Sequence, residues 1–143
     1  MLKHLLCLAA IGAIAPVATA VPGNFITGQW ETTLTVTLGK LSDTQTLSEC
    51  MAPEEANQSM EGLAEEFAGG MGCTSEITGT TADTVAFDLS CSPESVFTEG
   101  RATMTRVSST GFTLEGELGA DINGQLMPAT IKANSGRVGT CES

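Results

Sequence analysis

Four of the five cysteines, Cys50, Cys73, Cys91 and Cys141, are the residues of this chain best suited to chemistry. Thiolates can bind zinc or exchange electrons, and paired cysteines can form structural disulfides. The four are 23, 18 and 50 residues apart, so they include no CxxC pair, and the single histidine, His4, lies near the N-terminus. An even number of cysteines without metal-ligand spacing favours two disulfides over a zinc site.

Carboxylates are the second group that could act chemically. Beyond residue 20 the chain has no histidine and no tyrosine, which excludes imidazole acid–base chemistry and the usual serine and cysteine triads. A pair of carboxylates can hydrolyse glycosides, and Glu99, Glu115 and Glu117 lie on predicted strands. Acids that alternate along a strand ordinarily face water. We therefore expect no enzymatic activity, with a hydrolase that uses carboxylates alone as the alternative.

Two further patterns suggest metals, and each has a simpler explanation. The segment DING at residues 121–124 is similar to part of a calcium loop, but it lacks the downstream glutamate. Met51, Met60 and Met71 could offer thioethers to cuprous copper. Methionine is also a common filler of irregular cores, and no short repeated methionine motif occurs. We therefore expect neither a metal nor another cofactor.

Residues 1–20 have the pattern of a secretory signal peptide. Lys3 precedes an apolar run over residues 5–15, and Ala18 and Ala20 are small residues at the positions that signal peptidase recognises. The run is shorter than the roughly 20 residues that span a bilayer. We expect cleavage after residue 20, no membrane segment in the mature protein, and one exported, periplasmic domain over residues 21–143.

The chain is strongly acidic. It has 17 Asp and Glu against six Lys and Arg, a net charge of −11. Removal of residues 1–20 takes Lys3 away, so the mature domain carries −12. Such a charge disfavours nucleic acid and anionic lipid as partners.

Residues 73–91 predict a β-hairpin closed by a disulfide. Pairing Ile77 with Phe87 across the polar turn places Cys73 directly opposite Cys91, and both hydrophobic residues then share the face that we expect to be buried. This register favours the disulfides Cys73–Cys91 and, by elimination, Cys50–Cys141. The alternative is Cys50–Cys73 with Cys91–Cys141.

Other strands are predicted on both sides of this hairpin. Residues 28–38 alternate with Trp30 on the apolar side, and residues 43–50 are expected to return antiparallel. Residues 96–107 predict a strand whose register the sequence does not determine, because both alternations carry polar side chains.

Asn123-Gly124 is the preferred dipeptide of a two-residue hairpin turn. Centring the pairing on this turn places four pairs on one face: Ala120 opposite Met127, Leu118 opposite Ala129, Gly116 opposite Ile131 and Leu114 opposite Ala133. On the other face Glu115 lies opposite Lys132, which favours the same register. Pro128 cannot donate to a ladder, so its strand is expected to be an edge or to have a free side there.

One helix is predicted after the second strand. Pro53 suits a first helical position, and a single apolar stripe recurs at helical spacing. The stripe consists of Ala56, Met60, Leu63 and Phe67. The helix is weakened by Gly62 and ends at Gly69-Gly70, so it could act as a movable cover.

Four segments of this chain resemble a known family. They are GQWE at residues 28–31, CMAPEEA at residues 50–56, the hairpin at residues 73–91, and GRVGTC at residues 136–141. In this order they resemble small exported proteobacterial proteins, the domain-of-unknown-function family 3617. The resemblance spans essentially the whole mature chain and implies a periplasmic location. It transfers no activity.

These patterns predict a mainly β, α+β domain: an antiparallel meander of about seven strands, in a curved sheet or half-barrel, with one helix after strand 2. The apolar face of such a sheet exceeds what the helix can cover. We therefore expect a non-catalytic binding module for an apolar small molecule or a segment of a partner protein, with Trp30, Met60, Leu63 and Phe67 facing the ligand. The alternative is a structural or stress-related interaction protein with a closed core and no ligand.

Overall fold

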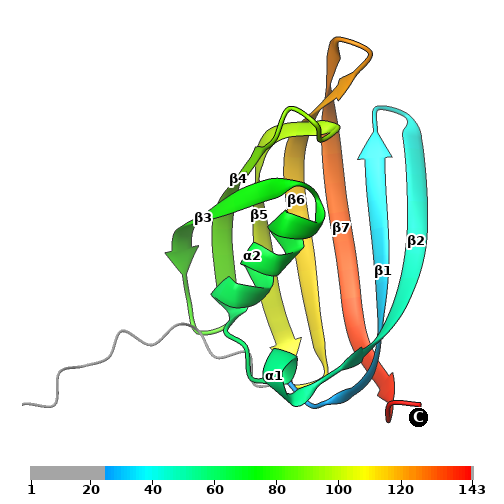
Figure 1. Ribbon diagram of the computed structural model, residues 1–143, viewed down its shortest axis with the longest axis vertical. Coiled ribbons are helices and arrows are strands. Elements are labelled where there is room, and N and C mark those ends of the chain that lie inside the picture. The colour runs from blue at the N-terminus through cyan, green and yellow to red at the C-terminus, as the bar shows by residue number, and fades with distance from the viewer. Residues whose placement is uncertain (1–24, 143) are drawn as a thin grey trace, which may run out of the picture.

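The computed structural model describes residues 25–142, which form one antiparallel sheet with two helices on one of its faces (Figure 1). The signal peptide expected at residues 1–20 lies outside the described residues. The elements, in chain order, are β1 (Gly28–Leu38), β2 (Leu41–Met51), α1 (Pro53–Ala56), α2 (Met60–Gly70), β3 (Cys73–Thr80), β4 (Thr84–Cys91), β5 (Phe97–Ser108), β6 (Gly111–Ile122) and β7 (Gln125–Gly139).

The strand order is β2-β1-β7-β6-β5-β4-β3. Strands that are consecutive in the chain pair with each other, except that β2 does not pair with β3. The last strand, β7, returns to pair with β1. The sheet thus has the topology of an up-and-down barrel that stays open between β2 and β3, where the two helices form the connection. The predicted seven-stranded antiparallel half-barrel is confirmed, and the sheet is not closed.

Both predicted disulfides are confirmed. Cys73 pairs with Cys91 and Ile77 with Phe87 in the β3–β4 ladder, as the hairpin pattern predicts. The second disulfide joins Cys50 to Cys141. Ile77 differs from expectation, because its side chain is 39% exposed although Phe87 opposite it is buried. The reason is that β3 is the last strand of the sheet, with a neighbour on one side alone.

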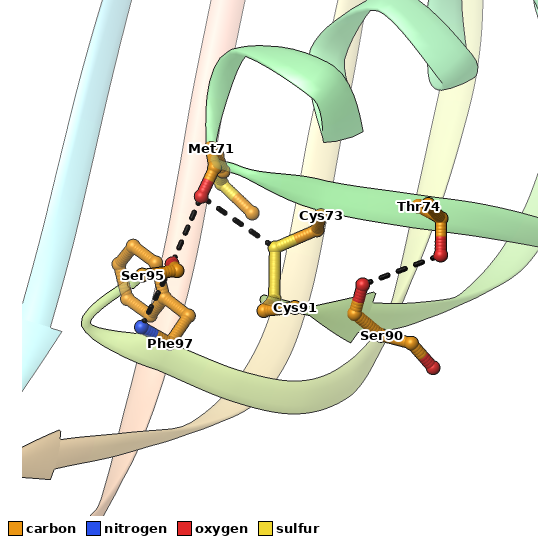
Figure 2. The surroundings of a disulfide bond; sticks show 7 residues. All are labelled: Met71, Cys73, Thr74, Ser90, Cys91, Ser95 and Phe97. Carbon is orange, nitrogen blue, oxygen red and sulfur yellow. Dashed lines mark hydrogen bonds between the residues drawn. A yellow bond between two sulfur atoms is a disulfide. The ribbon is translucent and has the colours of Figure 1, made fainter. Parts of the chain in front are cut away.

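The Cys73–Cys91 disulfide lies at the end of α2 (Figure 2). The Met71 carbonyl accepts a hydrogen bond from Ser95 Oγ at 2.9 Å, and Ser95 Oγ accepts one from the Phe97 amide at 3.1 Å. These contacts attach the loop before β5 to the residue that follows α2, so the C-terminal end of the helix is held in place.

The β6–β7 register agrees with the prediction at all four apolar pairs and at Glu115 opposite Lys132. β7 is an interior strand, but its pairing with β1 ends at Ala129. Pro128 lies just beyond that point and has a neighbour on the β6 side, Gly119. The N–H that proline lacks would therefore point to the side where β1 no longer pairs with β7, as expected for proline in a strand.

Two helices replace the single predicted one. The chain leaves helical geometry after α1, and Ser59 then caps α2, because its Oγ accepts a hydrogen bond from the Gly62 amide at 3.1 Å. Met60, Ala64 and Ala68 are completely buried, and Leu63 and Phe67 are half-buried. Two alanines bring α2 close to the sheet, so the buried stripe differs from the predicted one.

Trp30 is buried in an aromatic cluster at the start of β1. Its ring lies 5.5 Å from that of Phe25 and 6.1 Å from that of Phe112, measured between centroids. Its indole Nε1 donates a hydrogen bond to the Ile26 carbonyl at 3.0 Å. A buried Trp with a satisfied N–H contributes large apolar contact area.

The turn between β6 and β7 gives a first test of the fold. Asn123 has φ 55° and Gly124 has φ 83°, and an L side chain in this region costs about 1 to 2 kcal/mol. We expect Gly124→Ala to lower the unfolding free energy by that amount in urea denaturation. Gly79→Ala is the control, because Gly79 also has open space around it but no positive φ. Equal effects of the two variants would contradict the assigned turn.

Candidate functional site

A cleft of about 220 Å³ lies on the helix-bearing face of the sheet, between α2 and the strands β1, β2 and β7. It exists because α2 packs mainly on β3 and β4, at the other end of the sheet. The half of the face formed by β1 and β7 therefore has less cover, and Leu34 and Val36 of β1 are only half-buried.

The lining of the cleft is predominantly apolar. The apolar lining residues belong to α2 and to the strands β1, β2, β5, β6 and β7: Leu34, Leu47, Met51, Leu63, Phe67, Met104, Phe112, Leu114 and Ala133. Pockets for drug-sized ligands usually measure about 300 to 1,000 Å³, whereas a cavity of about 150 Å³ can hold a benzene ring. The cleft therefore suits one apolar chain or one large apolar side chain.

Three carboxylates border the same cleft. Glu49 comes from the end of β2, Glu55 from α1 and Glu66 from α2. Burial raises the pKa of Glu55, and the charges of Glu49, Glu66 and Glu54 raise this pKa further. The carboxylates are thus close enough to repel one another. None of the described residues that line the cleft is Lys, Arg or His.

The four residues expected to face a ligand are divided between the cleft and the core. Leu63 and Phe67 line the cleft. Trp30 and Met60 are 1% and 0% exposed and do not line it. Trp30 contacts Phe112, which does line the cleft, so Trp30 supports the cleft wall from behind.

The sequence placed Leu114 and Ala133 on the apolar face of the sheet, but it did not indicate that Met104, Phe112, Glu49 and Glu66 line the same cleft. Met104 of β5 and Phe112 of β6 line the cleft because of the order of strands in the sheet, and no local sequence pattern determines that order. The chain has 17 acidic residues, so the presence of Glu49 or Glu66 in the sequence does not by itself indicate a binding site.

A larger hollow of about 610 Å³ lies on the opposite face of the sheet. Its exposed side chains form opposite-charge neighbours across the strands: Asp88 beside Arg101, Arg101 beside Glu117, and Glu115 beside Lys132. Opposite charges on adjacent strands offset one another, and the three acids and two bases of this lining leave it a net charge of −1. We therefore place the candidate site in the smaller apolar cleft.

The residues considered as catalytic or metal-binding candidates lie on the exposed face of the sheet, in the hydrophobic core or in a turn. Glu99, Glu115 and Glu117 are exposed on the polar face, and Met51, Met60 and Met71 belong to the core or pack against it. In residues 25–142, no group of three or more His, Cys, Asp or Glu is placed to hold a metal ion. Asp121 Oδ1 accepts a hydrogen bond from the Gly124 amide at 2.8 Å, which explains the DING segment as a turn.

The two disulfides are typical of an oxidising environment such as exported proteins encounter. In the part of the chain that the structure describes, no helix has the length and apolar character needed to cross a membrane.

Comparison with known proteins gives one match. A family described as "Protein of unknown function (DUF3617)" matches residues 22–141, nearly all of the chain. No curated protein and no solved structure matches the chain. The predicted family is thereby confirmed, and the chain belongs to the DUF3617 family.

Proposed function

We propose that this protein is a non-catalytic periplasmic binding module that holds an apolar group in the cleft between α2 and β1. The observation that carries the proposal is the incomplete cover of the apolar face: α2 lies over β3 and β4, and the cleft over β1 and β7 has walls that are mostly hydrophobic. Clefts with apolar walls and few polar groups are the usual sites for small ligands.

The opening between β2 and β3 explains why such a cleft exists. If β2 and β3 paired, the sheet would close and its side chains would fill the interior. Here the chain between β2 and β3 forms α1 and the 11-residue helix α2 instead of closing the sheet. A helix of this length is marginally stable unless packing holds it. Its C-terminal end is held beside the disulfide, whereas its Leu63 and Phe67 side border the cleft. We expect this helix to adjust when a ligand enters.

The alternative, a structural or stress-related interaction protein, requires a closed core without a ligand site. An open sheet and an apolar cleft favour the binding module over this alternative.

The test uses N-phenyl-1-naphthylamine, an uncharged probe that fluoresces in apolar surroundings. We expect the mature protein to bind it, and Leu47→Gln to weaken binding about fivefold. Leu47 lines the cleft and is 54% exposed, so covering the rest of its side chain is worth about 1 kcal/mol.

Leu41→Gln is the matched control for this variant. Leu41 lies on the same strand and the same face of the sheet as Leu47, is 75% exposed, and does not line the cleft. Its replacement should leave probe affinity unchanged. Native mass spectrometry of periplasmic and refolded protein should then reveal a bound adduct in the former. A bare monomer that also fails to bind the probe would refute the proposal.

A further inference from the structure

The charge around the cleft mouth restricts what can occupy it. Glu49, Glu55 and Glu66 reach the cleft from three different elements, so the fold, not a local run of acids, brings them together. Glu49 and Glu66 are exposed, and Glu55 is half-buried. The cleft provides the site, and these carboxylates decide which charge its occupant can carry.

The carboxylates at the mouth repel one another. The pKa of Glu55 is raised first by burial and then by Glu49, Glu66 and Glu54. An anionic head group at the mouth would add to this repulsion, whereas a cation would relieve it. A neutral group would leave it unchanged.

We infer that the occupant of the cleft is a single-chain cationic amphiphile, with its apolar chain between α2 and β1 and its positive head beside Glu49, Glu55 and Glu66. This inference rests on the proposed function and adds the chemical class of the ligand. A cleft of about 220 Å³ holds one apolar chain or one large side chain, whereas a docked helix inserts several anchor side chains along its apolar face. Charge complementarity at the mouth selects an amine or quaternary ammonium head.

The experiment compares three probes of equal chain length below their critical micelle concentrations: dodecyltrimethylammonium, dodecyl maltoside and dodecyl sulfate. Binding is measured by displacement of N-phenyl-1-naphthylamine and by calorimetry, with circular dichroism to verify that the fold persists. We expect one cationic probe per protein, bound about tenfold more tightly than the neutral probe, and the anionic probe to bind most weakly. The preference should shrink in 1 M salt, where the screening length falls to about 3 Å.

Two triple variants separate local charge from total charge. Glu49→Gln with Glu55→Gln and Glu66→Gln should abolish the preference for the cation, so that the affinities for the three dodecyl probes differ by less than about twofold. Glu31→Gln with Glu76→Gln and Glu99→Gln changes the net charge equally. These three glutamates are exposed strand residues that do not line the cleft. This control should keep the preference.

Equal affinity for the three probes, or a preference for the anion, would overturn the cationic ligand and leave the apolar cleft standing. Equal loss of preference in both triple variants would assign the effect to net charge and would also overturn the inference. Loss of naphthylamine binding in the first variant would show that the carboxylates shape the cleft, which again contradicts it. If no probe binds the wild-type protein, the proposed function itself fails.

Discussion

The double variant Cys50→Ala with Cys141→Ala is expected to lose about 4 to 5 kcal/mol of unfolding free energy, because this disulfide closes a long loop. The two cysteines are 91 residues apart in sequence. Their bond joins β2, an edge strand, to the residues after β7, across the position of β1. Domains usually have a total stability of about 5 to 15 kcal/mol, so the variant should keep little of it.

The measurement is urea denaturation followed by circular dichroism. Both cysteines are exposed, so their replacement removes little packing, and the loss reports the cross-link itself. Ser48→Ala with Thr140→Ala changes two exposed residues in the same two segments and should alter stability by less than about 0.5 kcal/mol. A loss below about 2 kcal/mol for the cysteine variant would contradict the expected role of the disulfide.

Local patterns predicted the hairpins because each hairpin has two independent indicators. In β3–β4 the apolar alternation and the cysteines agree, and in β6–β7 the Asn123-Gly124 turn agrees with the charge pair of Glu115 and Lys132. The strand β5 has no such support. Its pairing with β6 shifts register twice, between Phe97 and Gly100 and between Arg106 and Ser108. Irregularities of this kind interrupt alternation, so the sequence does not determine which side chains face inward.

The pairing of β1 with β7 could not be predicted, since it joins segments about 100 residues apart and depends on the whole sheet. The structure shows how two of the segments on which the resemblance rests are placed relative to each other. Gly28 has φ 148°, and a Cβ there would lie 2.5 Å from Arg137 Nε. Arg137 Nε donates a hydrogen bond to the Thr27 carbonyl at 2.8 Å. The GQWE and GRVGTC segments thus meet side by side, with glycine leaving room for the arginine.

The candidate site was predicted only in part for a similar reason. Helical spacing placed Leu63 and Phe67 on an apolar stripe, and both line the cleft. The predicted stripe did not include Ala64 and Ala68, which the structure shows to be completely buried. Small residues let α2 approach the sheet closely, and this displaces the larger side chains toward the cleft. The position of the cleft follows from this contact between helix and sheet.

Trp30→Ala is expected to lower the unfolding free energy by about 3 to 5 kcal/mol, the usual cost of removing a large buried aromatic side chain. Trp30 is 1% exposed and contacts the rings of Phe25 and Phe112. Its removal would leave a cavity behind Phe112, which lines the cleft. Affinity for N-phenyl-1-naphthylamine should therefore fall in the same variant under conditions in which it remains folded.

Trp30→Phe separates the contributions of ring and hydrogen bond. It keeps an aromatic ring but leaves the Ile26 carbonyl without its indole donor, so we expect a loss of about 1 to 2 kcal/mol. Circular dichroism must report both transitions, because Trp30 is the single tryptophan of the chain. Val107→Ala, at a side chain that is 67% exposed, should change stability by less than about 0.5 kcal/mol. If Trp30→Ala had as little effect as Val107→Ala, Trp30 would not be the centre of this end of the core, and the cleft wall would not depend on it.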